Sequence, residues 1–250
     1  MPFKLGVVPY LNPLPLYFSL KDRPDIEIVA DFPANLGARL ENGEFDAALL
    51  PVADHIRGVG DGILGDAIVG ATREVRSVLL FSKVEIDQIE SVALDTSSHS
   101  SVALIQVLLR DFVKIQPDYQ NHAPDLSAML ARNDAALLIG DPALLAARNR
   151  GELHVYDLAT LWHAFTGKSF VFAAWIARKD LKNRGELENL LQNARNVGTA
   201  QISEIVASNP VQTSLPNAVV ESYLREAIEY RMIGAHRAGL QEFARRLQVL

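Results

Sequence analysis

Short apolar runs alternate along the chain with longer segments in which apolar residues recur at helical spacing. The apolar runs predict strands over residues 4–8, 26–30, 46–50, 75–81, 91–94, 135–139, 154–156 and 170–176. Several are apolar at every position, as expected for strands buried on both faces of a sheet. The helical spacing predicts helices over residues 36–42, 100–113, 126–131, 142–149 and most of the chain after 185, divided by Pro210 and Pro216. This alternation indicates an α/β protein.

One pattern of helix, polar turn and strand occurs twice. Residues 36–40 lead through a turn to the run Asp46-Ala-Ala-Leu-Leu, and residues 126–130 lead through a turn to Asp134-Ala-Ala-Leu-Leu. Ala and Leu are common enough for chance to produce one such match, but the shared context favours two lobes of similar topology. We expect each aspartate to lie where the turn enters its strand, and we assign neither a catalytic role.

Two lobes need connecting segments, and two places suit them. Residues 82–90 are polar and separate two strands, and residues 173–179 form a strand that runs into the C-terminal helices. We therefore predict a discontinuous first lobe, residues 1–85 plus 178–250, with residues 86–177 inserted as a second lobe. A small ligand would bind in the cleft between them.

Composition narrows the functions that such a fold could serve. The 250-residue chain holds no Cys, which excludes disulfides, thiol nucleophiles and cysteine-bound metal sites. Lys and Arg number 24 against 30 Asp and Glu, a formal charge of −6 without any basic run, which argues against a nucleic-acid or anionic-membrane partner. The longest apolar run, residues 170–177, is far short of the ~20 residues of a membrane span, and Pro9 breaks the N-terminal apolar stretch. We expect a soluble cytoplasmic protein.

Some motifs resemble catalytic or cofactor signatures but lack the context these need. Gly60, Gly62 and Gly65 have the spacing of a dinucleotide-binding loop, but neither a preceding strand nor a following helix is predicted, so we interpret them as a turn. The histidines lack the H-x-H or H-E-x-x-H spacing of a metal site. The run at 98–100, Ser-His-Ser, has no nucleophile-elbow pattern around it. Aromatic side chains are expected in the core: Trp162, Phe165, Phe170, Phe172 and Trp175.

Two loops that follow predicted strands carry side chains suited to binding. Residues 95–101 read Asp-Thr-Ser-Ser-His-Ser-Ser and open a helix, whose first free backbone N–H groups favour an anion. An ordinary helix cap needs one hydroxyl and this segment offers five, so we expect a carboxylate-binding loop. After the first strand, Asn12 lies among Pro9, Pro13 and Pro15, which restrict the backbone. The side-chain amide of Asn12 is thereby held at the end of a strand, where open α/β sheets bind ligands.

These loops belong to an ordered set of segments that resembles a known family. The set comprises residues 9–16 (Pro-Tyr-Leu-Asn-Pro-Leu-Pro-Leu), 76–78 (Arg-Ser-Val), 93–101 (Ala-Leu-Asp-Thr-Ser-Ser-His-Ser-Ser), 139–144 (Ile-Gly-Asp-Pro-Ala-Leu), 162–173 and 230–243. Together they are similar to the chorismate dehydratases of the futalosine pathway of menaquinone biosynthesis. The matches run in order from residue 5 to the C-terminus, and the ordered set is more specific than any one segment.

The resemblance implies a two-lobed fold of the type-2 periplasmic-binding-protein class with its ligand in the cleft. It also implies a cofactor-free reaction in which chorismate, a dicarboxylate, loses water to give 3-[(1-carboxyvinyl)oxy]benzoate, the first step of that pathway. On the family's pattern, Asn12 and Ser77 would be catalytic. The substrate would contact the following residues: Tyr10, Arg76, Thr96, Ser97, Ser98, His99, Ser100, Ser101, Gly140 and Asp141. Relatives often carry Arg-Thr where this chain has His99 and Ser100, so a contact made by that arginine would differ here.

An acidic protein that binds a dicarboxylate must supply local donors. The candidates are the helix end at 96–101 and Arg73 or Arg76, one of which could equally be a solvated surface residue. Elimination also needs a base for the ring proton. Apart from His99, the matching segments hold no obvious Glu or His at a cleft position. We therefore hypothesise that the substrate's own side-chain carboxylate accepts the proton, while Asn12 and Ser77 hold its polar groups.

Other functions on this fold stay open at this point. The pathway's later lyase, which makes dihydroxynaphthoate from a cyclic futalosine derivative, usually shows a Ser-Pro-Cys-Pro-Asn-Asp-like opening, whereas residues 8–12 read Val-Pro-Tyr-Leu-Asn. A non-catalytic small-carboxylate-binding protein would normally carry a signal peptide, and a ligand-sensing regulator would need a basic DNA-binding segment. The sequence leaves the oligomeric state open between monomer and homodimer.

Overall fold

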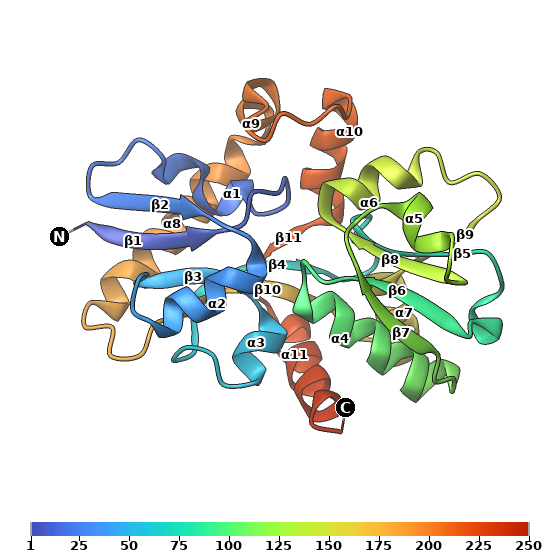
Figure 1. Cartoon of the computed structure of the whole chain (residues 1–250). Helices are drawn as coiled ribbons and strands as arrows, with labels where there is room; N and C mark the ends of the chain where they lie inside the picture. Colours follow the sequence, from blue (N-terminus) through green and yellow to red (C-terminus); the bar gives the residue numbers. More distant parts are fainter. Residues whose placement is uncertain (1, 250) are drawn as a thin grey trace.

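The strands of this computed structural model, which describes residues 2–249, form two separate sheets (Figure 1). The first sheet is six-stranded, in the order β11-β4-β10-β3-β1-β2. Its strands are β1 (Phe3–Val7), β2 (Ile26–Ala30), β3 (Ala47–Pro51), β4 (Ile63–Ala71), β10 (Phe170–Ala177) and β11 (Glu229–Arg231). The second is five-stranded, in the order β7-β6-β8-β5-β9, and consists of β5 (Val78–Ser82), β6 (Ser91–Asp95), β7 (Asp118–His122), β8 (Ala135–Ile139) and β9 (His154–Asp157). We call the parts built on these sheets the first and the second lobe.

Helices pack against both sheets. The first lobe has α1 (Leu14–Tyr17), α2 (Pro33–Glu41), α3 (Val52–Ile56), α8 (Arg184–Ala200), α9 (Ile202–Ser208), α10 (Asn217–Ser222) and α11 (Gly234–Leu247). The second has α4 (His99–Leu108), α5 (Leu126–Leu130), α6 (Gly140–Ala147) and α7 (Leu158–Thr166). A π-helical turn continues α4 (η3, Leu109–Val113) and another continues α10 (η4, Tyr223–Ala227). Helix α11 contacts both α3 and α4 and so packs against both lobes (Figure 1).

The two lobes share one strand arrangement. In the first, β1 is parallel to β2 and β3, and in the second, β6 is parallel to β7 and β8. In each lobe an antiparallel strand then flanks the last of these, β10 beside β3 and β5 beside β8. The prediction of two lobes with similar topology is therefore confirmed, and the twice-repeated Asp-Ala-Ala-Leu-Leu run lies at β3 and β8.

The sheets divide the chain at places other than the sequence boundaries 85 and 177. Strand β5 pairs with β8 and β9 in the second sheet, and β10 pairs with β3 and β4 in the first. The chain therefore crosses between the lobes at residues 72–77 and 167–169. Residues 75–77, expected as strand, belong to the first crossing, where the N–H groups of Val75 and Arg76 donate to the carboxylate of Asp157. An uninterrupted apolar run does not reveal its partner strand, which is why the sequence misplaced both crossings.

Several short elements lie outside the sequence prediction. Strand β7 is a polar edge strand that faces solvent along most of its length, so its composition resembles a loop. Strand β11 is three residues long and interrupts the C-terminal stretch expected as helix. Helices α1 and α3 are too short to show a period. Gly60 and Gly62 lie in the turn between α3 and β4, as interpreted from the sequence, whereas Gly65 lies within β4.

The core consists mainly of sheet residues and of aromatic side chains between the layers. Trp162 and Trp175 are fully buried, and Phe170 contacts both Trp162 and Phe243 edge to face. Phe165, expected in the core, is 42% exposed and stacks on Phe112 instead, because it lies on the outer side of α7. No helix within residues 2–249 is long and apolar enough to cross a membrane.

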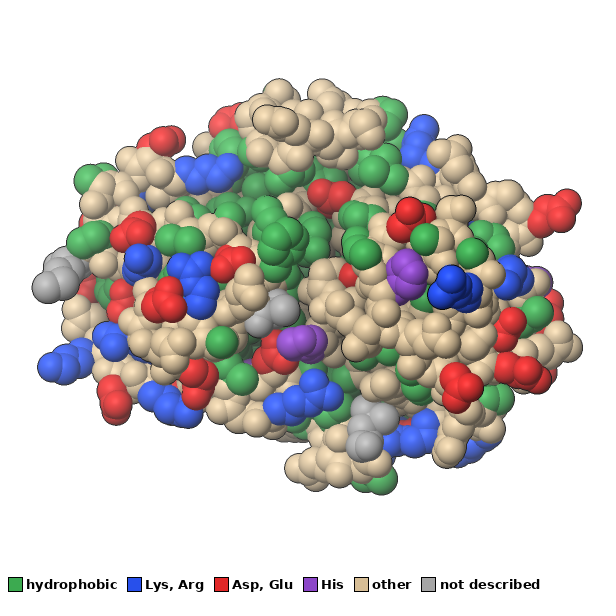
Figure 2. Space-filling view, viewed as in Figure 1, with side chains coloured by type: hydrophobic (Ala, Val, Ile, Leu, Met, Phe, Trp, Pro, Cys, Tyr) green, Lys and Arg blue, Asp and Glu red, His purple; other side chains and the backbone are tan. Residues whose placement is uncertain are grey.

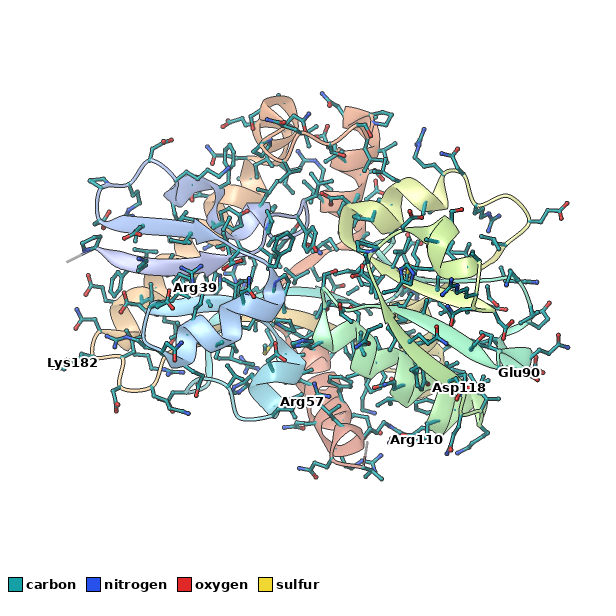
Figure 3. All side chains as sticks on the ribbon, viewed as in Figure 1. Arg39, Arg57, Glu90, Arg110, Asp118 and Lys182 are labelled. Atoms are coloured by element: carbon teal, nitrogen blue, oxygen red, sulfur yellow. The ribbon has the colours of Figure 1, made fainter. Side chains whose placement is uncertain are left out.

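On the face drawn in Figure 2, charged side chains are scattered over the outer parts of both lobes, and apolar side chains gather between the lobes. Figure 3 shows Lys182 of the first lobe and Glu90 and Asp118 of the second at opposite outer ends of the molecule. A ligand bound between the lobes would therefore be shielded from solvent by apolar side chains.

Candidate functional site

A cavity lies where the two lobes meet, and residues of both form its walls. Its place between two lobes is where proteins commonly bind small molecules. The first lobe contributes Val8, Tyr10, Asn12, Pro13, Pro33, Leu49, Pro51, Val69, Phe172 and Ala173, and the second contributes Val78, Ser97, Ser98, Ser101, Ile139 and Gly140. The lining is mostly apolar, and its polar side chains carry one amide, one phenol and serine hydroxyls.

The loop after β1 brings Asn12 to the cavity wall. Pro13 is the residue before α1 and Pro15 lies in its first turn, so the backbone on the C-terminal side of Asn12 is restricted. On the N-terminal side, the N–H of Leu11 donates to Oδ1 of Asp141 in the second lobe at 3.3 Å. Asn12 is thus held between a rigid helix start and a contact across the cleft.

The loop after β6 brings serine hydroxyls to the same cavity. Asp95, buried at the end of β6, accepts hydrogen bonds from the backbone N–H and the hydroxyl of Ser97 and from the N–H of Ile139. Ser98 caps α4, and its Oγ accepts from the N–H and the hydroxyl of Ser101 at 3.4 and 3.1 Å. The first turn of α4 and three serines therefore border the cavity, an arrangement that favours an anion.

The other residues of that loop do not line the cavity. Ser100 and His99 connect the lobes: the Ser100 hydroxyl accepts from the N–H of Ala53 at 3.0 Å, and Nδ1 of His99 lies 2.7 Å from Oδ1 of Asp54. The hydrogen bond to Asp54 is the main cause that raises the pKa of His99 above its ordinary value. Thr96 is exposed and borders a separate hollow at the outer side of the loop.

The structure places neither candidate arginine at the cavity. The guanidinium of Arg76 donates to Glu74 at 2.7 Å, to Ser222 at 3.0 Å and to Glu226 at 3.3 Å. Arg73 borders a different hollow, together with Glu74 and Glu226. Among the described residues, none of the cavity-lining side chains is Lys, Arg or His. A bound carboxylate would therefore meet hydroxyls, an amide and the end of α4.

Gly140 lines the cavity from the second lobe, and Asp141 follows it at the contact with Leu11. Gly140 has φ +63°, and a Cβ there would lie 3.2 Å from the ring of Tyr10, so the position requires glycine for both reasons. Burial raises the pKa of the Asp141 carboxyl to about 6, while its hydrogen bond from Leu11 acts in the opposite direction. Burial also raises the pKa of Tyr10. Asp141 is thus a mostly buried acid with a raised pKa beside the cleft.

Ser77 lies behind the cavity wall and not in it. It is fully buried, its carbonyl accepts from the N–H of Gly140 at 2.7 Å, and its hydroxyl accepts from the phenol of Tyr223 at 2.7 Å. The side chain of Asn12 also lies near the Tyr223 hydroxyl, where it acts to lower the pKa of that phenol. Sequence reasoning missed Tyr223, because a single tyrosine in a helical stretch does not indicate which distant residues its hydroxyl reaches.

Sequence comparisons match the whole length of the chain. A family model described as menaquinone biosynthesis matches residues 3–248. The chorismate dehydratase of Thermus thermophilus is 30% identical over 262 residues, spanning 98% of this chain and 95% of that protein. The chorismate dehydratase of Campylobacter jejuni is 24% identical over 253 residues, spanning 98% of this chain and 97% of that protein.

Solved structures share the fold at lower identity. A crystal structure of an Archaeoglobus fulgidus protein superimposes with a TM-score of 0.78 at 16% identity, covering 99% of this chain and 97% of that one. The periplasmic aliphatic sulphonate binding protein SsuA from Escherichia coli gives a TM-score of 0.65 at 20% identity, covering 99% and 87%. The fold is therefore periplasmic-binding-protein-like, as the sequence predicted.

Proposed function

The chain belongs to the menaquinone biosynthesis family, and within it we propose that the protein is a chorismate dehydratase, a cofactor-free lyase that converts chorismate to 3-[(1-carboxyvinyl)oxy]benzoate and water. The observation that carries the proposal is the similarity to chorismate dehydratases over nearly the whole chain. The cavity between the lobes supports it, because a small ligand could be enclosed there by polar groups from both sides.

The reaction depends on orienting the substrate and stabilising the charge of the departing hydroxyl more than on a cofactor. The C–H bond at the ether-bearing ring carbon and the C–O bond of the neighbouring ring hydroxyl break, the ring becomes aromatic, and the proton and hydroxide leave together as water. We propose that the substrate's own side-chain carboxylate accepts the ring proton first. The protein would then need to hold that carboxylate against the ring and to stabilise the departing hydroxyl.

The groups at the cavity suit these tasks. The first turn of α4 would hold one carboxylate through its free backbone N–H groups and the hydroxyl of Ser98, because the hydroxyls of Ser97 and Ser101 already donate to Asp95 and Ser98. Asn12 would hold a second polar group of the substrate from the opposite lobe. The apolar lining would exclude water and strengthen these interactions. Ser77, which lies behind the cavity wall, would support these groups through its hydrogen bonds with Gly140 and Tyr223.

The proposal is tested by incubating the protein with chorismate, without added metal or cofactor, and following products by chromatography with mass detection. Enzyme-dependent loss of one water to give the enolpyruvyl-bearing benzoate is expected. Unchanged chorismate with folded protein would refute the proposal. The same assay with the cyclic futalosine derivative would then identify the later lyase, and a thermal shift with chorismate alone would indicate a binding protein.

Single substitutions locate the activity. Asn12→Ala and Ser77→Ala are expected to lower turnover roughly ten- to a thousand-fold, the scale of lost positioning and electrostatic stabilisation. Asn193→Ala, on the exposed side of α8, is the matched control and should retain wild-type turnover. Near-normal turnover in both Asn12→Ala and Ser77→Ala would contradict the assignment of these residues.

A further inference from the structure

Asn12 and Ser77 are far apart in the sequence, and one further side chain contacts both of them. That residue is Tyr223, in the C-terminal segment where α10 passes into η4. We infer that Tyr223 is a positioning residue of the active site, which fixes the orientation of the Asn12 amide and of the Ser77 hydroxyl. The expected effect of Tyr223 on turnover rests on the proposed function, whereas its effect on the orientation of the Asn12 and Ser77 side chains does not.

The contacts of Tyr223 are buried and specific. Its side chain is almost completely buried, and its hydroxyl donates to Oγ of Ser77 at 2.7 Å. Burial raises the pKa of Tyr223 above its ordinary value, while its hydrogen bonds with Ser77 and Asn12 act in the opposite direction. The phenol therefore stays protonated and is available as one donor and as an acceptor.

The hydrogen-bonding capacity of a phenol determines how its partners are oriented. A tyrosine hydroxyl has a single hydrogen, and here Ser77 receives it. Its oxygen can then bond to Asn12 only as an acceptor, so the NH₂ group of Asn12 must be the donor. This leaves the carbonyl oxygen and the second N–H of Asn12 for the cavity. Ser77, whose oxygen already accepts, keeps its own hydrogen to donate.

The backbone around Tyr223 is fixed to the same crossing segment that carries Ser77. The neighbouring residue Ser222 accepts a hydrogen bond from Nη1 of Arg76 at 3.0 Å, so two adjacent residues of each segment are joined. Residues 223–227 form a π-helical turn. This geometry is rare in proteins, and where it does occur it is often at a functional site. Tyr223 thus links the loop after β1, the crossing at 72–77 and the C-terminal segment.

The decisive variant is Tyr223→Phe, which removes one hydroxyl and keeps the ring. The matched control is Tyr230→Phe, because Tyr230 is also buried and its hydroxyl has no hydrogen-bond partner within the described part of the chain. We expect Tyr223→Phe to lower kcat at least ten-fold with KM for chorismate within three-fold of wild type. Tyr230→Phe should keep kcat within two-fold. Equal kcat values in the two variants would overturn the inference.

A double substitution tests whether Tyr223 acts through Ser77. If it does, and acts through Asn12 as well, Tyr223→Phe should lower kcat by a smaller factor in the Ser77→Ala background than in the wild type. Losses that multiply would show independent roles and contradict the inference. Thermal unfolding monitors whether each variant folds. Should Tyr223→Phe fail to fold, Ser77→Ala removes the acceptor of the Tyr223 hydroxyl and must shift the side-chain NH₂ signal of Asn12 in a ¹H–¹⁵N spectrum.

A spectroscopic measurement separates this inference from the proposed function. In a ¹H–¹⁵N spectrum, the side-chain NH₂ signal of Asn12, assigned by its loss in Asn12→Ala, should shift in Tyr223→Phe and stay in place in Tyr230→Phe. A shift in a protein that does not dehydrate chorismate would uphold the positioning role and refute the function. An unmoved signal would refute the positioning role whatever the activity.

Discussion

Asp46 in the first lobe and Asp134 in the second occupy the same place in their lobes. The carboxylate of Asp46 accepts from the N–H of Lys4 at 2.9 Å, and its carbonyl accepts from the N–H of Arg178 at 3.1 Å. The carboxylate of Asp134 accepts from the N–H of Ser91 at 3.0 Å, and its carbonyl accepts from the N–H of Lys83 at 2.9 Å. Each aspartate thus joins the strand on either side of β3 or β8 at the end remote from the cavity.

At the cavity end the two lobes differ. The helix after β3 directs Asp54 to His99 of the other lobe, a partner that can carry a positive charge. The helix after β8 directs Asp141 to a backbone N–H only, that of Leu11, and burial leaves its pKa at about 6. At the ends remote from the cavity, which only join strands, the two aspartates make the same kind of hydrogen bonds. At the cavity ends, the carboxylate of one lobe pairs with a histidine and that of the other accepts only a backbone N–H.

The largest effect is expected at the remote ends. Asp134 accepts from Glu90 N–H and from the N–H and hydroxyl of Ser91, whereas Asp46 accepts from Lys4 N–H and pairs with Arg178. Asp134→Ala should lower the free energy of unfolding by roughly 3 kcal/mol, and Asp46→Ala by roughly half as much. The loss is larger at Asp134 because more donors lose their acceptor when its carboxylate is removed. Urea unfolding of both variants measures this. Equal losses would mean that the two positions are equivalent in energy as well as in place.

A smaller effect is expected at Asp141. Because the folded-state pKa lies above the ordinary value of 3.8, protonation of this carboxyl stabilises the fold. That contribution is fully present below about pH 4 and is lost as the pH rises through about 6. Asp141→Asn, which resembles the protonated form, should be more stable than wild type by on the order of 2 kcal/mol at pH 8 and equal to it at pH 4. Urea unfolding at both pH values measures it, and a difference independent of pH would contradict the assignment.

The smallest effect is expected at His99. Its pKa is raised mainly by the hydrogen bond to Asp54, with partial burial and Arg57 acting against it. The pair therefore stabilises the contact between the lobes below about pH 6.5, and this stabilisation is lost as the pH rises through the higher pKa of the folded state. His99→Gln should be less stable than wild type by about 0.5 kcal/mol at pH 5.5, since the pair is partly exposed, and equal to it at pH 9.

The partner residue provides the control for that prediction. Asp54→Asn should show the same pH dependence, and adding it to His99→Gln should cost nothing more at pH 5.5. A stability difference that persists at pH 9 would mean that His99 contributes by packing and not by charge.

The sequence anticipated those parts of the site that depend on local order. Asn12 follows a strand end of the first sheet and the serines at 97, 98 and 101 follow a strand end of the second, and the carboxyl ends of strands are where open α/β sheets bind ligands. It did not anticipate the directions of long side chains. Arg76 was expected at the substrate, but Glu74, Glu226 and Ser222 hold its guanidinium elsewhere, and those partners lie on a segment some 150 residues away or on its own loop.

The sequence by itself determined the fold class, the repeated Asp-Ala-Ala-Leu-Leu strands of the two lobes, and the two loops that carry polar groups to the cavity. These features follow from apolar runs and turn residues that are adjacent in the chain. Only the tertiary structure decided which lobe receives β5 and β10, and which distant hydroxyl meets Asn12 and Ser77. The reason is physical: hydrogen-bond partners of a strand edge or a phenol are chosen by the packing of the whole chain, and a local pattern contains no information about them.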